Sequence, residues 1–528
     1  MKKIVFIIVV LFIAIVSMAY LYFSGLNFEQ KTSQHSLYAA AANSSLIFSF
    51  ENDQSVIDIL NGQDLLQDII GEEKLAQLRA LNQVLTLPGP KKAFEHQSVY
   101  ISLVPGLDKS IDFLYSTQIN PEISADQLLK TLNQNSFEVE SDSGLLRLTL
   151  NDSTKFYVGT KDNLLVFSTA RNLVRQGLST QVNQANKFAE FIKSNSRINK
   201  NSLAEVYINF ETLPQLIKAT MPGRLSGELA PLNNQQAYAA LVYNFSKEKV
   251  LLTGVTASQN KRDYYQLFSN LNAQTTSIQN ILPENTASFT AYAIENYPAF
   301  KLTLNQWFKD TKKDKGVSST ITTIKNNYRI DIDKTIPNYL KGQFITFQLN
   351  TSEKIGAIGL SNGDKLDQLL LELSTTYDED IKQLKVDQVM YSLYGQAFEN
   401  FKRPFYTIVD NYMVFSNTPG VLKSFLSDYR SNKLLINTEN YSHTIAQLPG
   451  SSNIQFYMDL ANSSRILQQN IYLPFYRHIY SAKGLKDYAS VSFQLSGDKD
   501  KFLTNFLMVK KVKPVLPDSL PIVPQQGN

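Results

Sequence analysis

The 528-residue chain contains no cysteine. This absence excludes disulfide bonds, cysteine-ligated zinc, iron–sulfur clusters, thiol nucleophiles and a lipid-acylated cysteine. Histidine is also scarce, and the four residues His35, His96, His443 and His478 have no second histidine at metal-ligand spacing. We therefore predict no metal site, no cofactor and no catalytic residue that the sequence would identify.

The chain also lacks the sequence motifs of common nucleotide-binding proteins and zinc proteases. Neither G-x-x-x-x-G-K-[ST], G-x-G-x-x-G nor H-E-x-x-H occurs. The charge is almost balanced, with 51 Lys and Arg against 47 Asp and Glu and a formal net charge of +4. No basic run with interleaved aromatic residues is present, so we expect no nucleic-acid partner. The 43% of hydrophobic residues is typical of a globular protein.

A long apolar stretch, residues 4–23, follows a short end at residues 1–3. A helix of this length, at about 1.5 Å per residue, spans the hydrocarbon core of a bilayer. Lys2 and Lys3 precede the stretch, so the N-terminus is expected to be cytoplasmic and the bulk periplasmic. A cleaved signal peptide ending near Ser17-Met18-Ala19 is the alternative. The apolar character continues through Phe23, which favours an uncleaved, single-pass anchor in the inner membrane.

Two similar hairpin sequences indicate an internal repeat in the exported part. Residues 156–168, FYVGTKDNLLVFS, and 405–416, FYTIVDNYMVFS, both indicate an apolar strand, a turn at Asp-Asn and a second apolar strand. Further matches follow in the same order, among them residues 204–210 with 454–460 and residues 237–246 with 487–496. The sequence therefore predicts two copies of one domain, over residues 43–260 and 281–512.

The patterns within each copy predict an α+β fold: two tandem domains, each a mostly antiparallel sheet with packed helices, preceded by one transmembrane helix. A groove between the copies would be a common place for a ligand. Residues 24–42 are expected to form a linker. The prolines of residues 513–528 predict an extended tail.

One match to a catalytic motif, G-x-S-x-G at residues 359–363, raises the possibility of a serine hydrolase. Ser361 would be the nucleophile, and Asp410 with His443 or His478 would follow it in the chain order of a catalytic triad. The strand pattern is antiparallel, however, and Gly, Ser and Asn between a strand and a helix are ordinary turn and N-cap residues. We favour the turn and do not expect an enzyme.

The acidic run from Asp378 to Asp380 is a second chemical candidate. It lacks the alternating oxygen ligands and the glycine of a calcium loop, so we interpret it as a solvated helix end. The 27 tyrosines and 31 phenylalanines could line a ligand cavity, but most stand at strand positions that predict a packed core.

Residues 283–289, PENTASF, and the hairpin residues 162–168 with their counterpart resemble sequences in a class of bacterial envelope proteins of unknown function. The composition, free of cysteine and rich in Tyr, Asn and Gln, resembles that of the Bacteroidetes-type envelope. The resemblance implies one N-terminal span and a duplicated α+β exported region. It implies no activity, cofactor or catalytic residue.

These features together predict a membrane-anchored periplasmic protein of the cell envelope that acts by binding or scaffolding. Its partners would be the membrane, through the N-terminal helix, and an envelope protein or a lipid. Two alternatives remain, namely lipid or lipoprotein handling in an apolar cavity and the hydrolase that uses Ser361. The sequence does not identify the ligand, the oligomeric state, or whether both copies are functional.

Overall fold

A computed structural model describes residues 34–53, 88–106, 110–120, 138–149, 154–182, 185–197, 204–222, 235–244, 248–482 and 484–512, with a few single positions between these ranges. Among the helices it describes, none combines the length and the apolar character that a membrane crossing requires. The predicted cytoplasmic end 1–3, the predicted anchor 4–23 and the predicted tail 513–528 lie outside the described residues.

The strands of the described chain form one 20-stranded sheet, and all of its pairings are antiparallel. The first half of the sheet contains β1 (Leu46–Glu51), β2 (Ser98–Pro105), β3 (Ile111–Gln118), β4 (Glu138–Asp142), β5 (Leu145–Thr149), β6 (Lys155–Lys161), β7 (Leu164–Ser168), β8 (Ala204–Asn209), β9 (Ala237–Asn244) and β10 (Lys249–Ser258). The second half contains β11 (Thr286–Ala293), β12 (Leu340–Leu349), β13 (Lys354–Leu360), β14 (Ser374–Thr376), β15 (Lys382–Leu384), β16 (Phe405–Val409), β17 (Tyr412–Ser416), β18 (Ile454–Asp459), β19 (Tyr488–Asp498) and β20 (Lys501–Lys510).

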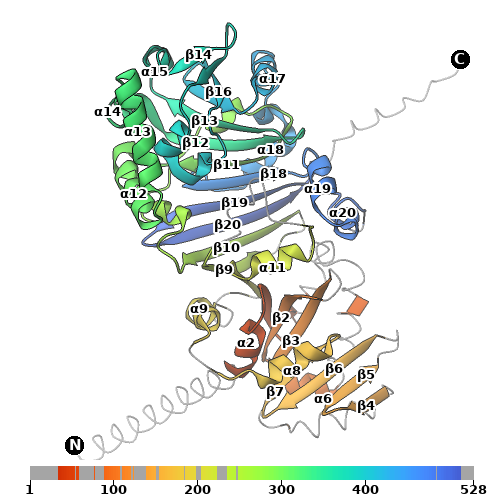
Figure 1. Cartoon of the computed structure of the whole chain (residues 1–528). Helices are drawn as coiled ribbons and strands as arrows, with labels where there is room; N and C mark the ends of the chain where they lie inside the picture. Colours follow the sequence, from red (N-terminus) through yellow and green to blue (C-terminus); the bar gives the residue numbers. More distant parts are fainter. Residues whose placement is uncertain are drawn as a thin grey trace, which may run out of the picture.

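The prediction of two separate tandem sheet domains is wrong, because β10 and β20 pair directly, from Lys249 opposite Val509 to Ala257 opposite Lys501. This pairing merges all strands into the one sheet of Figure 1. From one edge to the centre the order is β4-β5-β6-β7-β3-β2-β1-β8-β9-β10. From the other edge it is β14-β15-β16-β17-β13-β12-β11-β18-β19-β20. The two halves thus have the same connectivity but are parts of one sheet.

Among the described residues, the junction of the halves is formed by the central β10–β20 pairing and by packed side chains. Side chains from both halves pack there in one apolar cluster, which includes Leu241 and Leu252 from β9 and β10 with Tyr488 and Met508 from β19 and β20. The ligand groove that we expected between two separate domains is therefore replaced by hydrogen-bonded strands and packed side chains.

Helices cover both faces of the sheet (Figure 1). In the second half, α12, α13, α15 and α16 pack on one face and α17 and α18 on the other. The α-helices are α2 (Gln34–Ala41), α6 (Pro88–Phe94), α8 (Arg171–Ser179), α9 (Lys187–Asn195), α11 (Leu213–Lys218), α12 (Tyr297–Asp310), α13 (Asp314–Tyr328), α14 (Ile332–Thr335), α15 (Gly363–Leu370), α16 (Val389–Tyr394), α17 (Pro419–Arg430), α18 (Glu439–Ile445), α19 (Ser464–Asn470) and α20 (Leu473–Ile479).

Successive side chains of a strand point to opposite faces of the sheet, so one strand contributes side chains to the apolar clusters on both faces. Phe289 and Ala291 of β11 belong to the cluster under α17 and α18, whereas Tyr292 belongs to the aromatic cluster under α12 and α16. The ring of Tyr292 stacks on the ring of Phe344 of β12, with centroids 4.7 Å apart. All residues of β11 are buried, including Thr286, Ser288 and Thr290.

The segment expected to be a linker, residues 24–42, contains a structural element in its described part. Residues 36–41 of α2 are all buried, and the helix packs against strands β2 and β3. The hydroxyl of Ser102 donates to the carbonyl of Ala40 and that of Ser116 donates to the carbonyl of Ser36. Small and polar strand side chains therefore hold α2 close to the sheet.

The two predicted hairpins form as expected. Strands β6 and β7 pair on either side of Asp162, and β16 and β17 pair on either side of Asp410. Both aspartates are left-handed, with φ of 51° and 48°. Asp tolerates this conformation better than most residues, because its side chain can bond to the neighbouring backbone.

Candidate interaction surface

The residues of the hypothetical serine triad lie in ordinary structural roles. Ser361 is exposed at the end of β13, and its hydroxyl donates to the carbonyl of Asn338 at 3.2 Å. Asn362 caps α15 by accepting from the amide of Lys365 at 3.0 Å. Asp410 lies in the β16–β17 turn, where its carboxylate accepts from the hydroxyl of Tyr429 at 2.5 Å.

The histidines of that hypothesis are on helices α18 and α20. His443 forms its hydrogen bonds with Gln447, just beyond the end of α18. A nucleophilic serine needs a base within hydrogen-bond reach. In the described structure, the hydrogen bond of the Ser361 hydroxyl goes to a backbone carbonyl instead.

The acidic run at residues 378–380 is held by cations of α17. Lys423 lies 2.7 Å from Asp378, and Arg430 lies 2.8 Å from Asp380. The hydrogen bond from Lys423 lowers the pKa of Asp378. Within the described residues, no group of three or more His, Asp or Glu side chains is arranged to hold a metal ion.

A buried lysine, which the sequence patterns did not indicate, ties three helices together. Lys301 of α12 is 7% exposed, and its ammonium donates to the carbonyl of Ser392 in α16 at 2.5 Å. The same nitrogen lies 3.3 Å from the carboxylate of Asp333 in α14. Burial lowers the pKa of Lys301, and the charge of Asp333 opposes that effect. A buried ion pair of this kind fixes a packing arrangement more than it adds stability.

A buried carboxylate has a similar role in the first half. Glu205 of β8 is 2% exposed and accepts hydrogen bonds from the hydroxyl of Ser196, the amide of Arg197 and the hydroxyl of Tyr207. These bonds hold the chain that leaves α9. Burial, together with the charge of Glu205, raises the pKa of Tyr207 well above its ordinary value. Both carboxylate oxygens are engaged by the protein itself.

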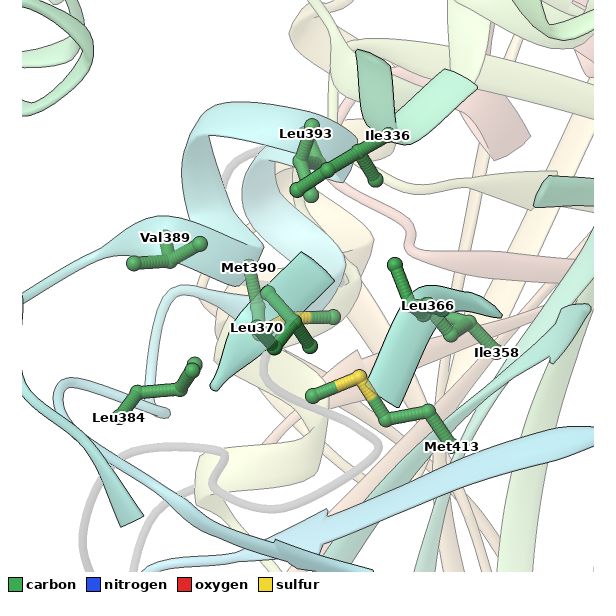
Figure 2. A pocket seen from close by; sticks show the side chains of 9 residues that line it. All are labelled: Ile336, Ile358, Leu366, Leu370, Leu384, Val389, Met390, Leu393 and Met413. Atoms are coloured by element: carbon green, nitrogen blue, oxygen red, sulfur yellow. The ribbon is translucent and has the colours of Figure 1, made fainter. Parts of the chain in front are cut away.

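The cavity in Figure 2 lies between β13, β17, α15, α16 and the short helix η4 (Ile336–Tyr339). Only aliphatic and methionine side chains line it, including Ile336, Leu366, Leu370, Met390 and Met413. Its volume of about 10 Å³ is no more than the space of one water molecule. It is a packing defect of the core and too small for an acyl chain.

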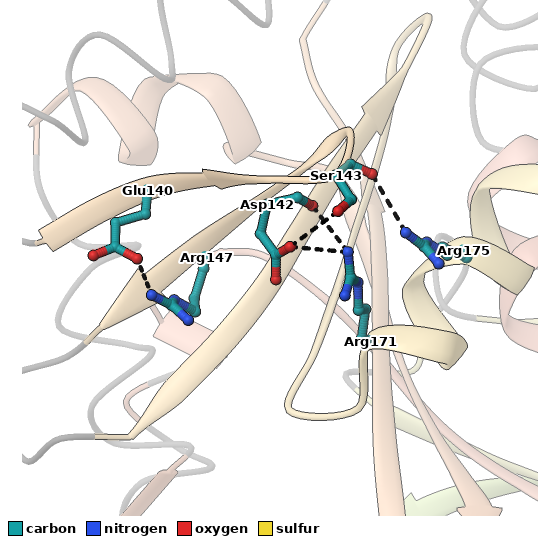
Figure 3. A network of polar contacts seen from close by, with 6 residues as sticks. All are labelled: Glu140, Asp142, Ser143, Arg147, Arg171 and Arg175. Carbon is teal, nitrogen blue, oxygen red and sulfur yellow. Dashed lines mark hydrogen bonds and ion pairs between the residues drawn. The ribbon is translucent and has the colours of Figure 1, made fainter.

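A polar network joins the β4–β5 hairpin to α8 (Figure 3). Arg171 donates to the carboxylate of Asp142 at 2.9 Å, and Arg175 donates to the carbonyl of Ser143 at 3.4 Å. Arg147 pairs with Glu140 across the two strands. These groups are partly exposed, and such ion pairs contribute about 0–1 kcal/mol each. Their role is to orient the hairpin on the helix.

The hairpin of helices α19 and α20, which connects β18 to β19, departs from ordinary packing. Both helices are fully described, and neither contains a buried residue. Leu473, at the start of α20, is 53% exposed. The remaining apolar side chains are only half-buried; they are Ile466, Leu467, Ile471, Phe475 and Ile479. In Figure 1 the hairpin projects at the side of the molecule beside β18 and β19.

Tyrosines attach this hairpin to the body. Tyr480 donates to the carbonyl of Leu460 at 2.6 Å, and the hydroxyls of Ser464 and Tyr476 lie 3.1 Å apart. The amide of Tyr472 donates to the carbonyl of Thr220 at 2.8 Å, in the connection between β8 and β9. The hairpin is therefore held in a defined position, although Leu473 is exposed and its other apolar side chains are only half-buried.

The helix at the corresponding connection of the first half behaves differently. Helix α11, between β8 and β9, buries Pro214 and Leu216. The exposed character of α19, which corresponds to α11, is thus a property of its sequence and not of this place in the sheet. We call the exposed side chains of residues 464–480 the hairpin surface.

The charge of this region is of one sign. No aspartate or glutamate occurs from residue 460 to residue 486, whereas Arg465, Arg477, Lys483 and Lys486 do. Arg465, Arg477 and Lys486 are exposed. No motif in the sequence singles out this stretch. The absence of acidic residues over 27 positions was the signal that could have found it.

Comparison with known proteins gives one result. Neither the curated proteins nor the solved structures include a match to the chain. A comparison with protein families matches residues 118–490 to a family described as a protein of unknown function, DUF3352. The match covers more than half of the chain, and it confirms the expectation of a family whose function is unknown. The chain belongs to the DUF3352 family.

Proposed function

We propose that this chain is a membrane-anchored, periplasm-facing protein of a Bacteroidetes-type envelope that acts by binding or scaffolding, and that it makes its contact through the hairpin surface. One observation carries the proposal: two consecutive helices, both fully described, have no buried residue and yet are rich in aliphatic and aromatic side chains. Leu473 is exposed and the other large apolar side chains of these helices are half-buried, and apolar surface that remains in contact with water is typical of interaction sites.

The N-terminal stretch supports the location in this proposal. Residues 4–23 are long enough and apolar enough to cross a bilayer, and Lys2 and Lys3 favour a cytoplasmic N-terminus. The rest of the chain would then be periplasmic. Absence of cysteine is compatible with an oxidising compartment.

The structural roles of the buried charged side chains Lys301 and Glu205 support binding rather than catalysis. Lys301 and Glu205, the most chemically conspicuous of the described groups, each hold neighbouring elements of the fold. No observation favours the two alternatives: the cavity of Figure 2 has room for about one water molecule, and Ser361 is bonded to a backbone carbonyl.

Site-specific photo-cross-linking in cells tests the proposal. A photoreactive amino acid is placed at Leu473 on the hairpin surface and, in a matched control, at Leu302 of α12, which is 73% exposed. We expect adducts from position 473, to protein or to lipid, and few from position 302. Equal or absent cross-linking at the two positions would contradict binding through the hairpin surface. Fractionation of the same cells would test the membrane location.

A further inference from the structure

We infer that the hairpin surface rests on a lipid bilayer that carries anionic headgroups, so that α19 and α20 form a second membrane contact besides the N-terminal stretch. The inference rests on the proposed function and names the partner of the same surface. Three features of the hairpin support a lipid surface: its apolar side chains, its aromatic residues and its charge.

The apolar side chains are placed as in a helix that lies in a membrane interface. Such helices put apolar side chains into the boundary between headgroups and acyl chains and keep their cations at the polar side. Leu473 is 53% exposed at the tip between α19 and α20, and Phe475 is half-buried beside it. Water contact of these groups is unfavourable, and insertion into the boundary region removes it.

The aromatic residues match the composition of a membrane interface. Tyr472, Phe475, Tyr476 and Tyr480 lie within nine residues of sequence. The rings of Tyr476 and Tyr480 are 4.8 Å apart, and both residues are partly exposed, although their hydroxyls bond to Ser464 and to the carbonyl of Leu460. Tyrosine is enriched at the level of the headgroups, because its ring is apolar and its hydroxyl is polar.

The charge distinguishes a lipid surface from a general protein partner. Arg465, Arg477 and Lys486 are exposed, and residues 460–486 contain no carboxylate that would repel an anionic headgroup. The chain as a whole has almost as many acids as bases, so this one-sided stretch is not a reflection of composition. Cations near a membrane surface are attracted by anionic lipids within about a Debye length.

The reach of the chain from the N-terminal stretch is compatible with this contact. Gln34, where the described structure begins, follows Phe23 by 11 residues. Eleven residues span at most about 40 Å when fully extended. An anchored chain would therefore hold the start of α2 within that distance of the bilayer.

The absence of cysteine makes a direct test possible. The substitution Leu473→Cys creates a single labelling site for an environment-sensitive fluorophore, and Leu302→Cys creates the control. Helices α12 and α20 lie at opposite sides of the molecule in Figure 1. The labelled full chains are reconstituted into vesicles of phosphatidylcholine with or without phosphatidylglycerol, and brominated lipids serve as quenchers.

We expect the label at position 473 to be quenched several-fold more strongly than the label at position 302 in vesicles that contain phosphatidylglycerol. The quenching at 473 should fall at high salt and in the double variant Arg465→Glu, Arg477→Glu. Both arginines are exposed, so circular dichroism should show an unchanged fold.

Quenching at position 473 that does not exceed the control would overturn the inference, as would quenching that is indifferent to the arginine variants. The two proposals fail separately. Protein adducts from position 473 in cells without lipid quenching in vesicles would retain a binding surface and remove the lipid contact. No adduct of any kind would remove the binding surface itself.

Discussion

The hydroxyl oxygens of Thr256 on β10 and Thr504 on β20 lie 2.8 Å apart inside the sheet. Thr256 is 6% exposed and Thr504 is 1% exposed. The two residues come from the strands whose pairing joins the halves of the molecule. Because both hydroxyls are buried, water cannot replace either partner when this hydrogen bond is broken. The free-energy cost of breaking it therefore measures how tightly β10 and β20 are joined.

The substitution Thr504→Val should lower the free energy of unfolding by about 1–3 kcal/mol, because it leaves the buried Thr256 hydroxyl without this partner. The double variant with Thr256→Val should lose less than the sum of the single losses, since neither hydroxyl then remains unpaired. Urea unfolding of the full chain measures all three values. Additive losses would show that the two hydroxyls do not interact.

Two glycines should respond in opposite directions to alanine. A Cβ at Gly254 in β10 would lie 2.0 Å from the carbonyl oxygen of Ala240 in β9, so Gly254→Ala should destabilise by about 2 kcal/mol or more. A Cβ at Gly316 in α13 would have no neighbour within 4 Å. Gly316→Ala should stabilise by about 1 kcal/mol through helix propensity. Thermal melts of the two variants check the signs, and a tolerated Gly254→Ala would mean that β9 and β10 are less tightly paired.

Stability should decline in alkali through Tyr100. Burial, with a smaller contribution from the charge of Glu205, raises the pKa of Tyr100 from 10.0 to about 12. As the pH rises, Tyr100 therefore loses its proton in the unfolded chain before it does so in the folded protein. The stabilisation that Tyr100 contributes is complete below pH 10 and is lost as the pH rises toward 12. The amount is about 3 kcal/mol. Tyr100→Phe should reduce this decline, measured by urea unfolding across that range, whereas the exposed Tyr377→Phe should not change it.

Lys301 should show the reverse dependence. Burial lowers its pKa from 10.5, so between the lowered value and 10.5 the unfolded chain binds more protons than the folded one. The unfolding free energy contributed by Lys301 should therefore rise with pH over that window. The stability of wild type relative to Lys301→Met measures it and cancels the shared effect of the tyrosines. A difference that stays constant with pH would show that the ammonium is not desolvated.

Local features of the fold were predictable from the sequence. The β6–β7 and β16–β17 hairpins depend on turns at Asp162 and Asp410, and turn chemistry of this kind acts over a few residues. Helix α13 was missed, because its only buried residues, Val317 and Ile324, make too narrow an apolar stripe.

Long-range features were not predictable. The pairing of β10 with β20 joins residues some 250 positions apart, and nothing in an alternating strand sequence specifies which distant strand it pairs with. We therefore assigned these strands to separate domains. Lys301 was missed because a lysine beside Phe300 on a helix ordinarily points to solvent. The hairpin surface was missed because its signal is a lack of acidic residues and not a motif.

The direct pairing of β10 with β20 has a mechanical consequence. The described chain enters the sheet at β1 and leaves it after β20, and only the ladders β1–β8, β8–β9, β9–β10 and β10–β20 separate these two strands. A pull between the two ends would load this short central path. Strands β2 to β7 on one flank and β11 to β19 on the other would carry little of the tension, so either flank could yield or bend without breaking the link between the ends.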